Sequence, residues 1–115
     1  MKLLTKAILK DLEKYPYRSQ EDTPLMEQKV IAKFFNPCGV GTWIVLEKVE
    51  ELSNGDLILW GLAELGNGYE LGTFSLKELE SLRLPFGLTI ERDMYLKNNC
   101  KVKDLIKEDD LMYNW

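Results

Sequence analysis

Histidine is absent from this sequence of 115 residues. Proteins use histidine as their commonest general base and their commonest metal ligand, so its absence removes both. A Ser-His or Cys-His catalytic pair within the chain is excluded, and none of the serines begins a Ser-x-x-Lys motif. The sequence therefore favours binding over catalysis, and we expect no cofactor.

Cysteines and long apolar runs are also scarce. Cys38 and Cys100 are expected to be free thiols, because the N-terminal stretch does not resemble a secretion signal, and we expect Cys38 to be buried or half-buried. Two cysteines without histidine do not complete a zinc site, and no metal is predicted. The longest apolar runs fall far short of the roughly 20 residues of a membrane helix, which predicts a cytoplasmic protein with no membrane contact.

The residues that are present have the composition of a globular domain, with 45% hydrophobic and 30% charged residues. The length predicts a single domain, 1–115. Fifteen basic and 19 acidic residues give a net charge of −4. This balance argues only weakly against nucleic acid, because a local basic patch can exist on an acidic protein.

Apolar residues at helical spacing predict a helix over residues 5–15, capped by Thr5 and ended by Pro16. A polar surface loop is expected next. Four strand-like runs follow, at 29–35, 42–49, 56–65 and 69–74. Gly39-Val40-Gly41 is interpreted as a turn between strands, not as a phosphate-binding loop, and Asn54-Gly55 predicts a tight hairpin with two positive φ angles. These short connections predict an antiparallel meander.

Ser75 and Glu78 form a capping box that predicts a short helix over residues 76–82. Residues 88–93 are expected to be a shorter fifth strand or an extended segment, and Asn99 to cap a C-terminal helix through residues 102–106. The predicted fold class is α+β, an antiparallel β-meander of four to five strands with an N-terminal helix, a short helix after the fourth strand and a C-terminal helix.

Consecutive apolar residues at 43–46 and 57–60 predict that both faces of the sheet are covered, since a sheet with one wet face would alternate. We expect the first and last helices to cover one face. Part of the other face would then meet a loop, the short helix or a partner, which makes a homodimer possible.

Carboxylates in or next to the strands are the main enzymatic candidates, because rigidly held carboxylates can share a divalent cation: Glu47, Asp56, Glu70, Glu91 and Asp93. Their spacing is not diagnostic of a nuclease, so surface carboxylates are the favoured interpretation. Arg92, between Glu91 and Asp93, is expected to anchor a loop through a bidentate contact with a carboxylate. The alternative is that Arg92 binds a phosphate or an acidic residue of a partner.

Lys6, Lys10 and Lys14 share one side of the first predicted helix and are the candidate nucleic-acid surface. Asp11 and Glu13 interrupt that helix, so a solvated face is the favoured interpretation. At the other end of the chain, residues 111–115 form an apolar tail that includes Trp115. We expect this tail to fold back on the sheet or to dock on another subunit.

Several motifs resemble a bacterial family of unknown function: K-F-F-x-P (33–37), T-W (42–43), E-L-G-x-F-S-L-x-E-L (70–79) and G-L-x-I-E-R-D (87–93). Members are typically carried on plasmids, conjugative transposons and other integrative elements. The resemblance implies a mobile-element accessory gene but no reaction. The matched polar or aromatic positions are the binding candidates: Trp43, Glu47, Glu91, Arg92 and Asp93.

The leading hypothesis is a non-enzymatic protein-interaction module of a mobile genetic element, with an unidentified protein partner in conjugation, plasmid maintenance or anti-defence. The alternatives are a divalent-metal-dependent nuclease using Glu47, Glu91 and Asp93, and a nucleic-acid-binding accessory protein using the lysines of the first helix.

Overall fold

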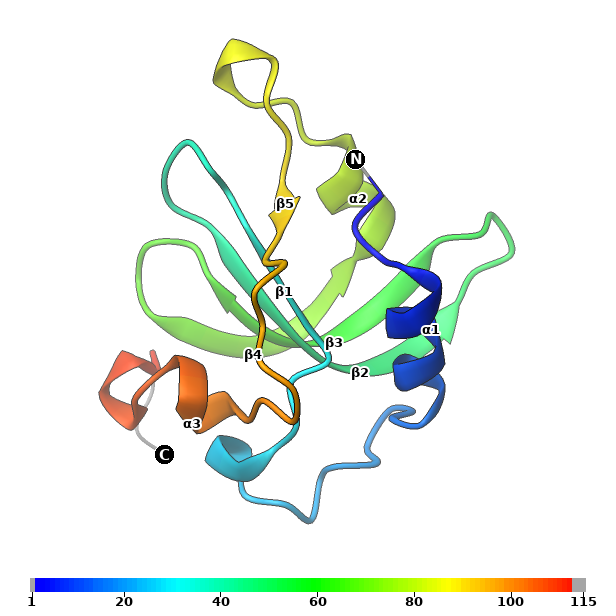
Figure 1. Cartoon of the computed structure of the whole chain (residues 1–115), viewed down its shortest axis with the longest axis vertical. Coiled ribbons are helices and arrows are strands. Elements are labelled where there is room, and N and C mark those ends of the chain that lie inside the picture. Colours follow the sequence, from blue (N-terminus) through cyan, green and yellow to red (C-terminus); the bar gives the residue numbers. More distant parts are fainter. Residues whose placement is uncertain (1, 113–115) are drawn as a thin grey trace.

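The computed structural model describes residues 2–112, and it is a five-stranded sheet with helices on both sides (Figure 1). The elements, in chain order, are α1 (Lys6–Glu13), η1 (Leu25–Glu27), β1 (Ala32–Phe35), β2 (Thr42–Glu51), β3 (Leu57–Glu64), β4 (Tyr69–Ser75), α2 (Leu76–Ser81), η2 (Pro85–Gly87), β5 (Glu91–Arg92), α3 (Val102–Leu105) and η3 (Glu108–Asp110). The predicted α+β class is confirmed.

The sheet has the strand order β4-β3-β2-β1-β5, and every pairing is antiparallel. Strands β1 to β4 form the predicted meander, and β5 returns to the free side of β1. The β2–β3 hairpin is confirmed, but its turn differs from the prediction. The amide of Gly55 donates to the carbonyl of Leu52, and Gly55 alone in this loop has a positive φ, of 84°.

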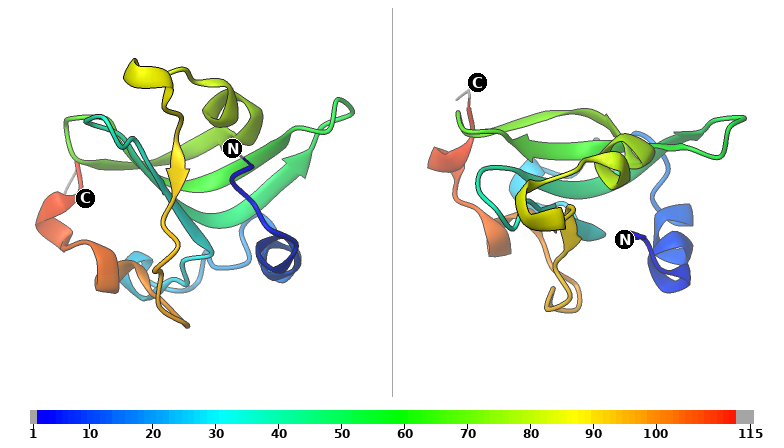
Figure 2. Two further views of the ribbon diagram at one scale, coloured as in Figure 1. Left: turned by 45° about the horizontal axis from the view of Figure 1, so that its top comes forward. Right: turned by 90° about the horizontal axis from the view of Figure 1, so that it is seen from above.

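Two apolar clusters lie on opposite faces of the sheet, as the alternation along β2 shows: Trp43 and Val45 belong to one cluster, and Ile44 and Leu46 to the other. On the first face the cluster includes residues of α1 and α2. On the second face it includes residues of α3 and η1. The expectation that the first and last helices share one face is therefore wrong, and Figure 2 shows α1 and α3 at opposite ends of the sheet.

The helix caps account for most of the helix boundaries. The Thr5 hydroxyl accepts from the amide of Ile8, and the Ser75 hydroxyl accepts from the amide of Glu78, as predicted. Asn99 is not a cap. The Asp104 carboxylate accepts from the amide of Lys101, so α3 begins two residues later than Asn99 would set it.

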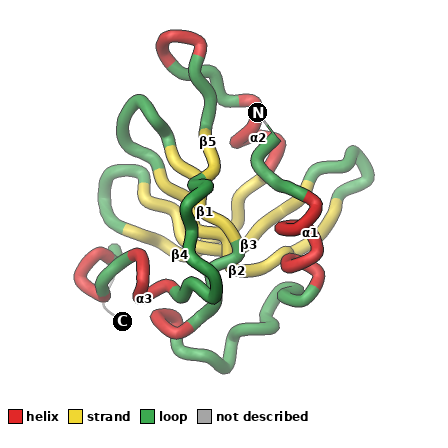
Figure 3. Tube along the Cα trace, in the orientation of Figure 1, coloured by secondary structure: helices red, strands yellow, loops and turns green. Residues whose placement is uncertain are grey.

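Loops make up much of the remaining chain (Figure 3). The first strand is shorter than predicted, because Val30 donates to the carbonyl of Cys100 and leaves the β1–β2 register.

Among residues 2–112, no helix combines the length and the apolar character that crossing a bilayer requires. The part of the predicted C-terminal tail at 113–115 lies outside the described residues.

Candidate functional site

Glu47 lies in a β-bulge of β2. The register with β3 shifts between Val45 and Glu47, so that Leu46 is an extra residue and Glu47 lies opposite Trp60. A bulge re-aims the side chain that follows it. Here Glu47 faces the second side of the sheet, where its exposed fraction is only 2%.

The Glu47 carboxylate binds the segment between α1 and β1. Oε1 accepts from the amide of Arg18 at 2.8 Å, and Oε2 accepts from the amide of Gln20 at 2.9 Å. Arg18 has a left-handed backbone, with φ 72°. Such a conformation costs a non-glycine residue about 1–2 kcal/mol, and the buried charge offsets that cost. The contacts of Glu47 are those of a residue that holds a loop in place.

Two glutamines extend this anchor, and the sequence analysis missed both. The Gln20 amide group donates to the carbonyls of Lys29 and Leu46 and accepts from the amide of Lys29. The Gln28 amide group donates to the carbonyls of Gln20 and Thr23. Their only signal in the sequence is their position in a polar segment, which does not distinguish a buried glutamine from an exposed one.

Arg92 also holds a distant segment of the chain. Its Nη1 donates to the carbonyl of Leu3 at 2.8 Å and, more weakly, to that of Lys2 at 3.4 Å. The expected carboxylate partner is thus replaced by two main-chain carbonyls. The amide of Leu3 donates in turn to Glu80 of α2, at 2.9 Å. Arg92 therefore fixes the N-terminal segment over the first face.

The structure keeps the proposed metal-binding carboxylates apart. Asp93 lies 3.9 Å from the ammonium of Lys33 and accepts from the amide of Tyr95, and Glu91 pairs with Phe35. Both belong to the β5 side of β1, whereas Glu47 lies on β2 under the Arg18 segment. In residues 2–112, no group of three carboxylates or thiols is placed to hold a metal ion.

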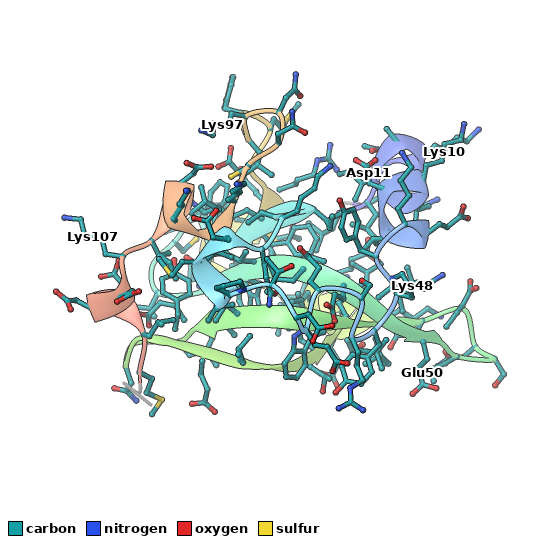
Figure 4. All side chains as sticks on the ribbon, turned by 90° about the horizontal axis from the view of Figure 1, so that it is seen from below. Lys10, Asp11, Lys48, Glu50, Lys97 and Lys107 are labelled. Atoms are coloured by element: carbon teal, nitrogen blue, oxygen red, sulfur yellow. The ribbon has the colours of Figure 1, made fainter. Side chains whose placement is uncertain are left out.

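Lys6 and Lys10 of α1 and Lys14, the C-cap residue of this helix, are all exposed. Figure 4 shows Lys10 pointing away from the body of the molecule. The spacing of four residues puts these ammonium groups along one side of the helix. This stripe is available to a ligand, and whether it binds nucleic acid stays a prediction.

Asp56 ties the β2–β3 hairpin to the start of α2. Its carboxylate accepts from the hydroxyl of Ser75 and from the amide of Lys77. These two hydrogen bonds, the Ser75 hydroxyl first, lower the pKa of Asp56. Ser75 thereby caps α2 and binds Asp56 with one hydroxyl.

Trp43 packs in the first cluster, with an exposed fraction of 8%, and its ring also lines a groove at the outer side of β4. The groove measures about 370 Å³ and is mostly apolar. Its lining includes Ala63, Leu65, Gly72, Phe74 and Met112. Trp43 is thus a core residue that also lines a surface groove.

Three loop tips at one end of the sheet expose apolar side chains: Val40, Leu65 and Phe86, with exposed fractions of 64%, 68% and 95%. We call them the loop-tip cluster. The Cys38 thiol lies 3.7 Å from the carbonyl of Pro85, and a Cβ at Gly66 would lie 3.8 Å from Val40, so the three loops are neighbours. In Figure 1 the η2 tip lies at the top, the β1–β2 loop at the upper left and the β3–β4 loop below it at the left. Cys38 is exposed, which corrects the expectation of a buried or half-buried thiol.

Residues 3–110 match the family described as protein of unknown function, DUF2958. The chain belongs to this family. The match covers almost all of the described fold, from the segment held by Arg92 to η3. No curated protein and no solved structure matches the chain.

Proposed function

We propose that this DUF2958 protein is a non-enzymatic interaction module encoded by a mobile genetic element, and that the loop-tip cluster is its contact surface for a protein partner. The mobile-element setting rests on the sequence motifs at residues 33–37, 70–79 and 87–93. The contact surface rests on the geometry of the loops.

The backbone conformation and the exposure of Phe86 together support this surface. It has φ 63° and ψ 24°, a left-handed conformation that suits glycine better than phenylalanine. Its ring is 95% exposed, so it contributes little to the core. A large apolar side chain kept in a strained conformation at a protruding tip is typical of a residue selected for binding. Its partner would offer an apolar pocket with a polar rim.

Tyr95 provides a matched control. It is also a 95% exposed aromatic residue, but it lies in the loop between β5 and α3 and has no left-handed backbone. A photo-crosslinking phenylalanine analogue would be placed at position 86 or at position 95 in cells that carry the element. We expect one prominent crosslinked protein from position 86 and none from position 95.

The crosslinked protein would then be purified and titrated with the wild type, Phe86→Ser and Tyr95→Ser. Aromatic anchors at interfaces contribute 2 kcal/mol or more, so Phe86→Ser should weaken binding by about 30-fold. Tyr95→Ser should bind like the wild type. Equal crosslinking from both positions, or equal affinity of the two variants, would contradict the proposal.

The nuclease and nucleic-acid alternatives are tested in the same protein. The wild type is incubated with labelled single- and double-stranded DNA, with and without Mg²⁺ or Mn²⁺. Metal-dependent cleavage that Glu91→Gln abolishes would replace the interaction module with a nuclease. Salt-sensitive binding lost on joint replacement of Lys6, Lys10 and Lys14 would support a nucleic-acid partner instead.

A further inference from the structure

The two edges of the sheet differ in how much main chain they leave unpaired. β5 contains only two residues, and such short edge strands offer little to a partner. β4 contains seven residues, and its outer side pairs within residues 2–112 only at Tyr69, through Leu111 and Met112. Among the described residues, the stretch 70–74 therefore has no partner on its outer side, and we call it the free edge of β4.

The hydrogen bond of Met112 fixes which groups of β4 point outward. Its amide donates to the carbonyl of Tyr69 at 2.8 Å, so the main-chain groups of Tyr69 face away from β3. In an antiparallel strand the two groups of one residue point to the same side and alternate along the strand. No register shift interrupts the β3–β4 pairing. The amides and carbonyls of Leu71 and Thr73 therefore also point outward.

This free edge is short, and Gly72 is its centre. Met112 closes it at Tyr69, and α2 begins directly after Ser75. A second β4, running antiparallel with Gly72 opposite Gly72, would place Leu71 of each copy opposite Thr73 of the other. The outward amides and carbonyls of Leu71 and Thr73, four groups in each copy, would then all be hydrogen-bonded across the interface. A longer partner strand would meet Met112 at one end and the α2 turn at the other.

The side chains suit the same register. Glu70 is the only charged residue of β4, and it would face Phe74 of the other copy instead of a second carboxylate. The two Glu70 carboxylates would be roughly 13 Å apart along the strands. Three usual protections of an edge are missing from β4, because it has no lysine, no proline and no bulge.

We infer that β4 is a self-association edge, at which two copies of this chain pair antiparallel about Gly72 to form one continuous ten-stranded sheet. The groove beside Gly72, lined by Trp43 and Phe74, lies at this junction. Leu65 of the loop-tip cluster also lines this groove, but Phe86 does not, so the experiments on Phe86 and on Gly72 can fail independently.

A cysteine at Gly72 tests the register. Gly72 has no positive φ, and a Cβ there would meet no atom within 4 Å, so the variant should fold. Directly opposed residues of this kind have Cα atoms about 4.5 Å apart, which a disulfide can span. In a Cys38→Ser background, Gly72→Cys should form a covalent dimer on mild oxidation. Glu70→Cys and Thr73→Cys should not, because their copies lie too far apart.

A proline at Thr73 tests the edge without covalent chemistry. The Thr73 amide points outward, so proline removes no bond to β3, and edge strands tolerate it. Analytical ultracentrifugation should show a concentration-dependent mass rising from 13.4 kDa towards twice that value for the wild type and Thr73→Val. Thr73→Pro should stay at the monomer mass and retain the wild-type circular dichroism spectrum. If Thr73→Pro does not fold, the Gly72→Cys crosslink still tests whether two copies pair at β4.

Three results would overturn the inference. The wild type could remain monomeric at every concentration with no Gly72→Cys crosslink. A dimer could persist in Thr73→Pro, which would place the interface elsewhere. A dimer could form only after removal of residues 113–115, which would show that the end of the chain itself occupies the edge.

Discussion

The Oε1 atom of Glu47 accepts a 2.8 Å hydrogen bond from the main-chain amide of Arg18, 29 residues earlier in the chain. One buried carboxylate thus stabilises a strained backbone that no regular element supports. The β-bulge at Leu46 makes this contact possible, because it turns Glu47 towards the side of the sheet where the Arg18 segment passes.

Glu47→Ala should lower the free energy of unfolding by about 3 kcal/mol, because one buried and one part-buried amide lose their carboxylate acceptor. Urea titration measures the loss. Glu50→Ala on the exposed end of the same strand is the control, and it should change stability by less than about 0.5 kcal/mol. Equal effects of the two substitutions would contradict the anchoring role of Glu47.

Gly61→Ala should prevent β2 and β3 from pairing as they do. A Cβ at this position would collide with the main-chain carbonyl oxygen of Ile44, and the sheet has no flexible atom there to move aside. We expect a loss of about 3 kcal/mol or more in thermal unfolding. Gly72→Ala on the neighbouring strand meets open space and should unfold close to the wild-type temperature. A well-tolerated Gly61→Ala would contradict the close approach of the Ile44 carbonyl to Gly61.

Asp56 should make stability depend on acid pH. Because its pKa is lowered in the folded state, its contribution is present above the unfolded pKa of about 3.9 and is lost as the pH falls through the folded pKa. Asp56→Asn should therefore be less stable than the wild type at pH 7, and the difference should narrow below about pH 4. Melting temperatures of both proteins between pH 2 and pH 7 measure this, with the exposed Asp22→Asn as a control. A gap that stays constant over this range would refute the prediction.

Phe86→Gly should leave stability unchanged or raise it by up to about 1 kcal/mol, because glycine adopts the left-handed conformation without the steric cost, although it also loses more chain entropy on folding. Denaturant unfolding tests this. Phe86→Val should be destabilising, since a β-branched side chain fits that conformation poorly. A large loss of stability in Phe86→Gly would indicate that the Phe86 ring packs against other residues of the protein.

Arg92→Ala should release the N-terminal segment. The guanidinium supplies hydrogen bonds to the carbonyls of Leu3 and Lys2, and we expect a loss of about 2 kcal/mol. Hydrogen exchange should become faster around residues 2–4 and in α2, which contacts Leu3 through Glu80. Arg83→Ala is the control, because within residues 2–112 the one side-chain hydrogen bond of Arg83 is to the carbonyl of its near neighbour Ser81. Unchanged exchange at residues 2–4 would contradict this anchoring.

The meander could be predicted from the sequence because its determinants are local. Apolar runs, glycine turns and the hydroxyl caps Thr5 and Ser75 act within a few residues of where they occur. The placement of the helices could not be predicted, because it depends on which face of the sheet each loop carries the next helix to. The bulge at Leu46 leaves no local pattern either, and strict alternation would have put Glu47 on the other face.

The candidate residues also divide into features that the local sequence predicts and features that depend on distant contacts. The importance of Arg92 was predicted, but its partners are main-chain carbonyls of Lys2 and Leu3, which no sequence pattern identifies. Phe86 was overlooked because a phenylalanine between Pro85 and Gly87 looks like an ordinary turn residue. Only its φ angle and its exposure distinguish it from a core aromatic.

Several hydrogen bonds join the first thirty residues to the last third of the chain. Leu3 binds Glu80 and Arg92. Val30 binds the carbonyl of Cys100, and Val102 binds the carbonyl of Gln28. During synthesis on the ribosome, the hairpins of β1 to β4 are available early, but the second face of the sheet is not closed until α3 has left the exit tunnel. The nascent chain therefore completes its core only after α3 has emerged, and until then we expect the uncovered face of the sheet to be accessible to chaperones.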